Sequence, residues 1–202
     1  MDVARRVNAA LRPVPGWVAY VLGALPLCWL VMRGFTGDLG ANPVKELEHT
    51  LGLHGLQFLL GTLAVTPLRR LTGISLIRWR RAMGLTAFAY IVLHLAVWLF
   101  LDMQLRWPEI ARDLTRRPYI IIGMAGLAMM LPLALTSNDA AIRAMGAAAW
   151  RRLHRLAWPA ALAGGVHFLM VVKSWPPEPM VYLVILAVIL GLRLARFGPR
   201  RG

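Results

Sequence analysis

The sequence contains few charged residues and only one cysteine. Charged residues make up 16% of the 202 residues and hydrophobic residues 58%, whereas a soluble domain has about 25% and about 45–50%. This composition excludes a disordered chain and a fibrous repeat, and the single Cys28 excludes an intrachain disulfide scaffold. The class that remains is a polytopic membrane protein, which we expect to form one domain over residues 1–202.

Long apolar runs occupy most of the chain. A membrane-spanning helix needs about 20 mostly apolar residues, and lipid offers the backbone no hydrogen-bond partner, so every spanning run must be helical. We therefore predict an all-α integral membrane protein that forms a six-helix transmembrane bundle. The six runs are Trp17–Phe35, Leu51–Pro67, Ala82–Leu101, Pro118–Thr136, Leu153–Val172 and Pro179–Leu194.

Acidic residues are scarce, with nine against 23 Lys and Arg and a net charge of +14. The cations lie between apolar runs and form no basic stripe interleaved with aromatic residues, so nucleic acid is not an expected partner. Cytoplasmic connections of membrane proteins are enriched in Lys and Arg. Sixteen of the 23 cations lie on the side of the N-terminus. This bias predicts that both termini are cytoplasmic and that these cations contact membrane lipid at the inner surface.

Histidines inside the apolar runs are the first candidates for a functional site, because polar groups in hydrocarbon are costly. His94 lies thirteen residues after Arg81, and His167 lies twelve residues after Arg155. Both runs lead from the inner to the outer side in the predicted topology, so the two imidazoles lie at similar depth. Two neutral imidazoles facing each other can be the axial ligands of a low-spin haem. Each histidine alone is also compatible with a hydrogen bond between helices.

His154 differs from this pair because it lies beside arginines near the inner surface. It precedes His167 by thirteen residues, which is about 20 Å and about 220° of rotation on a straight helix. Pro159 lies between them and can kink the helix. Either the kink brings the rings to one face, or His154 serves a separate site, for which a second haem, a flavin and a quinone are candidates. An interfacial residue without a ligand is the alternative.

Small and cationic residues near the histidines are further candidates for cofactor binding. Gly164 precedes His167 by about one turn and would let a flat macrocycle approach the backbone, although close helix packing explains it equally well. Arg116 and Arg117 lie at the outer end of the fourth run, where they could bind haem propionates or anchor the helix.

Several other polar residues carry weaker patterns. His54 in the second run fits a structural role, and His49 in the preceding connection fits a solvated residue. Glu46 and Glu48 lie two residues apart in an outer connection, where such carboxylates are usually solvated. A docking site for a positively charged partner is the alternative interpretation of this pair.

Motifs of nucleotide-binding and hydrolytic enzymes are missing. The sequence has no Walker loop, no Gly-x-Gly-x-x-Gly after a strand, no His-Glu-x-x-His and no Gly-x-Ser-x-Gly. Reducing equivalents would therefore come from a quinol, a separate reductase or a bound flavin. We expect no catalytic residues and no substrate chemistry in the chain itself.

Five segments between residues 40 and 156 resemble a known family. They are Gly40–Val44, Leu63–Arg70, Arg117–Ile120, Leu131–Ser137 and Trp150–Leu156. These strings resemble the MsrQ (YedZ) family, the haem-binding membrane subunits of a bacterial periplasmic methionine-sulfoxide reductase system, in the ferric-reductase-like transmembrane group. The similarity extends from about Gly40 to Leu194.

The resemblance implies a b-type cytochrome of the bacterial inner membrane that contains one or two haem b groups. It implies electron transfer from the quinone pool, with FMN or a cytoplasmic flavin reductase as further candidates, to a periplasmic molybdopterin subunit, MsrP, which repairs oxidised envelope proteins. The family's haem histidines fall on His94, His154 and His167. Two alternatives remain: a quinol-coupled cytochrome b for another periplasmic oxidoreductase, and a small transporter or scaffold without a cofactor.

Overall fold

The computed structural model describes residues 2–172 and 177–195, and it contains helices and connections with no strand in these ranges. Lys173, Arg196, Arg200 and Arg201, which enter the charge count, lie outside the described residues. The elements in chain order are α1 (Asp2–Leu11), α2 (Val18–Thr36), α3 (Pro43–Thr72), η1 (Ile77–Trp79), α4 (Arg80–Val97), η2 (Trp98–Asp102), α5 (Trp107–Arg116), α6 (Pro118–Leu135), α7 (Asp139–Met145), α8 (Ala147–Leu153), η3 (His154–Leu156), α9 (Ala157–Val171) and α10 (Pro177–Leu194).

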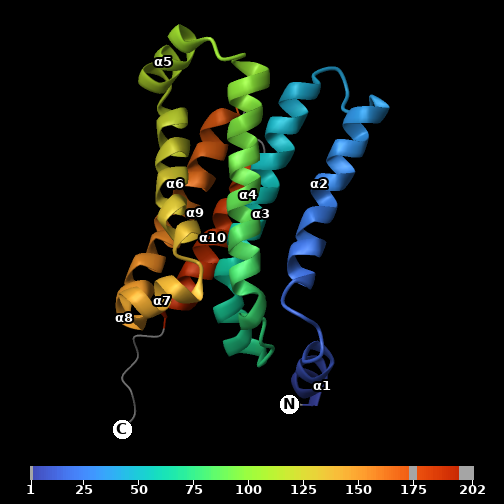
Figure 1. The fold of residues 1–202 in the computed structure, drawn as a ribbon, viewed down its shortest axis with the longest axis vertical. Coiled ribbons are helices and arrows are strands. Elements are labelled where there is room, and N and C mark those ends of the chain that lie inside the picture. Colours follow the sequence, from blue (N-terminus) through green and yellow to red (C-terminus); the bar gives the residue numbers. More distant parts are fainter. Residues whose placement is uncertain (1, 173–176, 196–202) are drawn as a thin grey trace.

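The long helices run side by side and leave two ends with different elements (Figure 1). One end carries α5, and we call it the α5 end. The opposite end carries α1, α7 and α8, and we call it the α1 end. Most of the connections are therefore gathered at the two ends of the bundle.

Five helices of the described chain are long and apolar enough to cross a membrane: Val18–Thr36, Pro43–Thr72, Ile77–Asp102, Pro118–Leu135 and Pro177–Leu194. They confirm the predicted all-helical membrane protein, and each contains or overlaps one of the predicted runs. The predicted count of six is not confirmed, because the run Leu153–Val172 is divided between α8, η3 and α9. Proline explains the division: Pro159 cannot donate to the carbonyl of Arg155, and the chain tightens into a 3-10 turn at His154–Leu156.

Helix α3 is longer than the predicted run Leu51–Pro67 because its ends carry strong local signals. The Asn42 side chain accepts a hydrogen bond from the Lys45 amide at 3.2 Å, and Pro43 occupies the first turn. At the other end Gly73 adopts a φ of 77°, the left-handed conformation that closes helices. These caps extend α3 to 30 residues.

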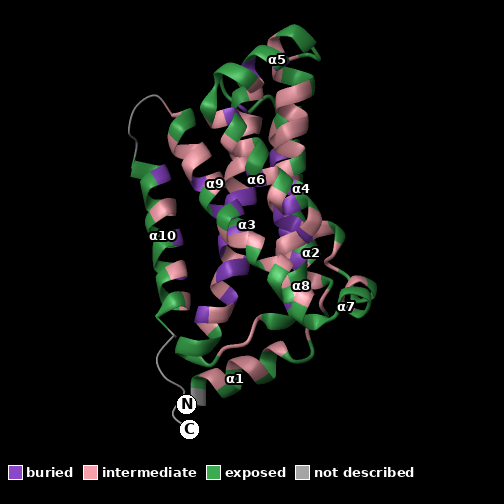
Figure 2. Ribbon diagram, turned by 90° about the vertical axis from the view of Figure 1, so that its left-hand side faces the viewer, coloured by how far each residue is buried: buried purple, intermediate pink, exposed green. Residues whose placement is uncertain are grey.

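The core is centred on α3, where buried residues concentrate along the helix (Figure 2). Helices α4, α6, α9 and α10 contribute the other side chains of the main apolar cluster. Its buried members are Leu56, Leu59, Leu60, Leu63, Ala87, Met130, Ala160, Ala161, Leu186 and Ile189. Because α3 contacts α2, α4, α9 and α10, it is the central helix of the bundle.

A proline in α3 creates a link to α10. Pro67 has no N–H, so the Leu63 carbonyl four residues earlier lacks its helical donor. Arg193 of α10 donates to this carbonyl from Nε at 3.1 Å and also from Nη2. The Arg193 guanidinium lies over the ring of Trp158 in α9, 5.4 Å from its centroid. One side chain thus joins three helices.

Candidate cofactor site between α3, α4, α6 and α9

A cavity of about 520 Å³ lies among these four helices toward the α5 end. Its walls are mostly apolar and include Leu56 of α3, Ile91 of α4 and Met130 of α6. His94 and His167 line it from α4 and α9. A mostly apolar cavity of this size with a few polar groups is typical of a site for a small molecule or cofactor.

The two histidines of the cavity lie close to each other. Their ring centroids are 6.2 Å apart, and the ring planes are nearly perpendicular at 82°. The similar depth that the arginine spacing predicts is therefore present in the structure. The pairing needs α4 and α9, which are distant in sequence, to present the two rings at the same level of the bundle.

Main-chain carbonyls fix the protonation of both rings. The Nδ1 of His94 lies 2.8 Å from the Glu48 carbonyl, and the Nδ1 of His167 lies 2.7 Å from the Tyr119 carbonyl. A carbonyl only accepts, so each Nδ1 carries the proton and donates it. In the neutral imidazole, Nε2 then holds the lone pair that a metal requires.

Each ring also packs against a glycine of a neighbouring helix. A Cβ at Gly52 would lie 3.1 Å from Nδ1 of His94, and a Cβ at Gly123 would lie 2.8 Å from Nδ1 of His167. Each glycine follows the hydrogen-bonded carbonyl, that of Glu48 or Tyr119, by four residues on the same helix. We call the carbonyl and its glycine a histidine seat. Neither seat is predicted by the sequence, because its only signal is a glycine inside a predicted span.

The pair of rings fits a metal held in a macrocycle. With metal–nitrogen bonds of about 2.0 Å on either side, opposed imidazoles have centroids roughly 6 Å apart, close to the observed separation. Within the part of the chain that the structure describes, no group of three or more His, Cys, Asp and Glu side chains could hold a metal ion. A bare ion would therefore lack ligands, whereas a porphyrin supplies four nitrogens itself. Gly164 also lines the cavity, as a close approach of a flat macrocycle requires.

Charged side chains line the cavity on the side of the α5 end. The Nζ of Lys45 lies 3.2 Å from Glu48 Oε2 and 3.1 Å from Asp102 Oδ2. Arg117 pairs with Asp113 at 3.0 Å and donates to the Tyr119 hydroxyl at 3.1 Å. The bond to Tyr119 raises the pKa of Arg117, so the guanidinium stays fully charged.

Only one of the two predicted arginines reaches the cavity. Arg117 lines it, whereas Arg116 lies exposed in the last turn of α5 and is not part of the lining. Lys45 is the second cation of the lining, and no sequence pattern distinguishes it from the other cations of the chain.

His154 lies outside the cavity, in the 3-10 turn between α8 and α9. Its ring stacks on Trp150 with centroids 3.8 Å apart, and its Nε2 lies 3.1 Å from the Thr136 hydroxyl. That hydroxyl donates its hydrogen to the Pro132 carbonyl at 2.6 Å, so Nε2 of His154 is the donor to Thr136. The structure therefore does not bring His154 to the face of His167, and it leaves Nδ1 as the ring's lone-pair nitrogen.

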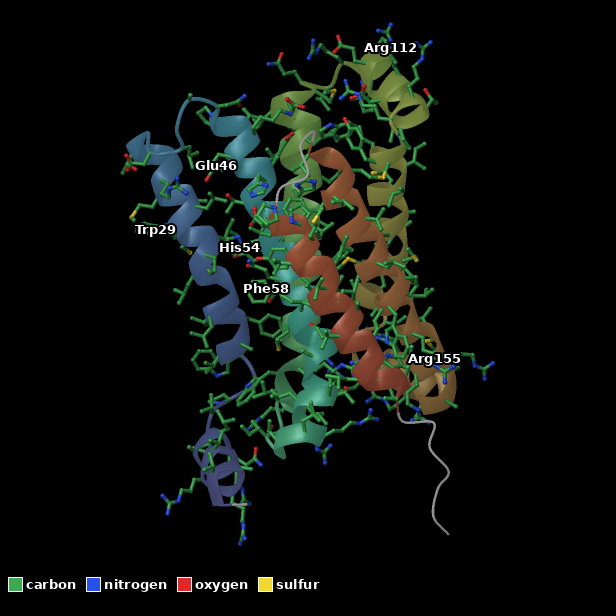
Figure 3. The ribbon with its side chains drawn as sticks, turned by 180° about the vertical axis from the view of Figure 1, so that it is seen from behind. Trp29, Glu46, His54, Phe58, Arg112 and Arg155 are labelled. Carbon is green, nitrogen blue, oxygen red and sulfur yellow. The ribbon has the colours of Figure 1, made fainter. Side chains whose placement is uncertain are left out.

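Other polar residues of the first half of the chain pair within the protein. Glu46 forms an ion pair with Arg33 at 3.3 Å, and Nδ1 of His54 donates to the Thr50 carbonyl at 2.7 Å. Figure 3 shows Glu46 and His54 on the side of the bundle that faces α2. His49 is exposed, as predicted, although it also lines the cavity and lies 3.9 Å from Glu178.

The sequence of the chain matches proteins of a known family. Residues 50–165 match the model of the ferric reductase like transmembrane component. Heme-binding MsrQ subunits of protein-methionine-sulfoxide reductase from Brucella ovis, Brucella canis and Brucella suis are each 50% identical over 200 residues. The alignment covers 97% of this chain and 90% of each relative. The chain belongs to the MsrQ family. This confirms the resemblance of the five sequence segments, and the matched region includes His94 and His154.

Proposed function

We propose that the chain is a b-type cytochrome subunit that binds haem between His94 and His167. The observation that carries the proposal is the pair of rings 6.2 Å apart, each with Nδ1 hydrogen-bonded to a carbonyl. The relatives' designation as heme-binding subunits supports it. Bound haem supplies one-electron transfer between the ferric and ferrous states of its iron.

The two histidines determine what such a site does. If His94 and His167 both held the iron, no coordination position would remain for a substrate, which would suit electron transfer and not bond-making. The walls around His94 and His167 are mostly apolar, which limits the contact of a bound group with water. The chain therefore acts as an electron-transfer subunit without substrate chemistry of its own.

Residues of the lining orient the cofactor in this proposal. Lys45 and Arg117 are the cations that line the cavity on the side of the α5 end, where they would bind the anionic propionates. Gly164 leaves room for the macrocycle on α9. The existing ion pairs of Lys45 and Arg117 hold both cations in place before the cofactor binds.

His154 is the candidate for a second redox group near the α1 end. Its Nδ1 keeps a lone pair, and arginines of α8 and η3 precede and follow His154 in the chain. A second haem, FMN or a quinone are the candidates for this position. One or two haem b groups are thus compatible with the five histidines of the chain.

We further propose a six-span topology in the bacterial inner membrane with both termini cytoplasmic. The Lys and Arg bias toward one side supports it, and α8, η3 and α9 together supply roughly 25 residues for the sixth span. Electrons enter from the quinone pool or a cytoplasmic flavin reductase and leave for the periplasmic molybdopterin subunit MsrP. That subunit reduces methionine sulfoxide in envelope proteins.

A visible spectrum of the purified protein with a redox titration tests the proposal. We expect a low-spin Soret band after expression with haem supply, and the number of titration steps counts the redox groups. Absence of the band would overturn the cytochrome and favour a cofactor-free transporter or scaffold. Pull-down of the periplasmic partner separates MsrP from another oxidoreductase.

A further inference from the structure

The segment between Asp102 and Arg117 crosses the α5 end of the bundle, and both of these residues line the histidine cavity. The segment contains α5, which lies beyond the ends of α4 and α6 (Figure 1). The continuous helical segment Ile77–Asp102 has 26 residues, or about 39 Å at the helical rise. This exceeds a hydrocarbon layer of about 30 Å, so α5 lies outside the hydrocarbon.

Charge at this end is almost completely neutralised within the protein. Arg33, Lys45, Arg106 and Arg117 each form an ion pair with a carboxylate. The cations at this end without such a pair, among the described residues, are Arg112 and Arg116.

The two unpaired cations lie on one helix, one turn apart, at positions i and i+4 of α5. Like charges at this spacing destabilise a helix. Both side chains are exposed, and Figure 3 shows Arg112 at the tip of the α5 end, directed away from the bundle. Glu109 and Asp113 lie three residues before these arginines and offset part of the repulsion, but their ion pairs are with Arg106 and Arg117. The guanidinium groups of Arg112 and Arg116 are therefore available to an external anionic group.

The opposite face of α5 fixes the helix to the bundle. Ile110 and Asp113 are each only 6% exposed, and Asp113 holds Arg117. Trp107, in contrast, is 64% exposed on the same helix as the free cations. Trp and Arg are the residues that contribute most to binding energy at protein interfaces.

The turn that places α5 across the bundle is conformationally unfavourable. Gln104 and Leu105 have φ values of 49° and 57°, a left-handed conformation that costs energy for residues other than glycine. The turn follows the π-helical segment Trp98–Asp102, a feature that often occurs at functional sites. The contacts of the buried Ile110 and Asp113 keep α5 next to the cavity despite this unfavourable backbone.

We propose that the exposed face of α5 that carries Arg112 and Arg116 is the docking surface for an acidic face of a water-soluble electron-accepting protein. This inference rests on the proposed electron-transfer function. A second copy of this chain does not fit, because it would present the same two cations and carries a net charge of +14. An acidic partner removes the repulsion between Arg112 and Arg116 and receives the electron beside the cavity.

The test measures electron transfer from the reduced haem protein to its proposed partner. The holo-protein in nanodiscs of neutral phosphatidylcholine is reduced and mixed in a stopped-flow instrument with the molybdopterin subunit of the same bacterium. We expect Arg112→Glu to slow haem oxidation about tenfold or more at low salt and to weaken its dependence on ionic strength. Arg5→Glu makes the same charge change at an exposed position of α1, at the opposite end of the bundle (Figure 1), and should leave the rate unchanged.

The outcomes separate this inference from the proposed function. An unchanged Soret band in Arg112→Glu establishes that the cofactor site is intact. An oxidation rate in Arg112→Glu equal to that of the unmodified protein overturns the docking surface alone. A rate loss that appears only with phosphatidylglycerol in the nanodisc would assign α5 to lipid headgroups and overturn the proposal. If the unmodified haem protein is not oxidised at all, both the partner and the surface are wrong.

Discussion

The α5 end and the α1 end of the bundle use charge in different ways. At the α5 end most cations pair with carboxylates, as Lys45 does with Glu48 and Asp102. At the α1 end, Arg81–Asp139 is the one pair between an arginine or lysine and a carboxylate that the described residues form. Paired charges hold defined positions around a cavity, whereas an excess of one sign interacts with lipid and orients the chain. A strongly basic protein can therefore contain a cavity whose cations are each paired with a carboxylate.

The largest effect that distinguishes the two ends concerns the histidines. We expect His94→Ala and His167→Ala each to abolish the low-spin haem spectrum of the cavity, because one imidazole cannot supply both axial ligands. His154→Ala should leave that spectrum intact, since His154 lies outside the cavity. Absorbance normalised to protein, with electron paramagnetic resonance of the oxidised form, measures the change. Equal loss of the signal in all three variants would contradict the separation of the sites.

A smaller but more specific effect concerns the histidine seats. In Gly123→Ala the new methyl group would lie 2.8 Å from Nδ1 of His167, so the ring must shift. Changes in the groups that orient a metal ligand cost about 10- to 100-fold in affinity. We expect haem affinity to fall by this amount in Gly123→Ala. The loss should be smaller in Gly52→Ala, where the distance from the new methyl group to Nδ1 of His94 is 3.1 Å.

The matched control for these variants is Gly191→Ala in α10, where a Cβ would meet no atom within 4 Å. Haem titration of the apo-protein measures all three substitutions. Because alanine favours helix over glycine, the control should bind haem normally and unfold no more easily. Normal haem affinity in Gly123→Ala would show that the seat does not position His167.

The link between α3 and α10 predicts an effect on stability and not on the spectrum. Arg193→Met leaves the Leu63 carbonyl without a donor, which should cost about 1–3 kcal/mol. Pro67→Ala restores a helical N–H to that carbonyl, so the loss caused by Arg193→Met should be smaller in a Pro67→Ala background. Thermal unfolding in detergent of the four proteins of this cycle measures the coupling. Strictly additive losses would contradict the proposed role of Arg193.

The smallest effect is expected at the ion pair of the α1 end. A hydrogen bond from Arg81 lowers the pKa of Asp139 below its usual 3.8. A carboxyl whose pKa is lower in the folded state than in the unfolded state stabilises the fold fully at pH values above its unfolded-state pKa. This contribution disappears as the pH falls through the folded-state pKa. Thermal unfolding between pH 6 and pH 3 should therefore show a slightly steeper decrease than in Asp139→Asn. The difference should be small because Asp139 is fully exposed. Identical profiles would exclude this contribution.

The depth of the histidine pair could be predicted from sequence, whereas its surroundings could not. The rise of a helix is fixed, so the distance from Arg81 to His94 sets a level in the bundle. The contacts of Gly52, Gly123 and Lys45 depend on which helices become neighbours and how they rotate, and no local pattern encodes this. The apolar run that includes His154 reads as one span because hydropathy does not register the effect of a proline on backbone geometry.

Both histidine seats use the main chain as the acceptor, and this has a consequence for reduction potential. A side-chain carboxylate behind an imidazole can be removed by mutation or protonated by acid, and either change alters the electron density that the ring gives to a metal. A peptide carbonyl can be neither removed by mutation nor protonated in the pH range where a carboxylate is. The midpoint of a metal bound by His94 and His167 should therefore stay nearly constant when the side chains of Glu48 and Tyr119 are replaced, so evolution or design would have to tune it through the polarity of the cavity walls.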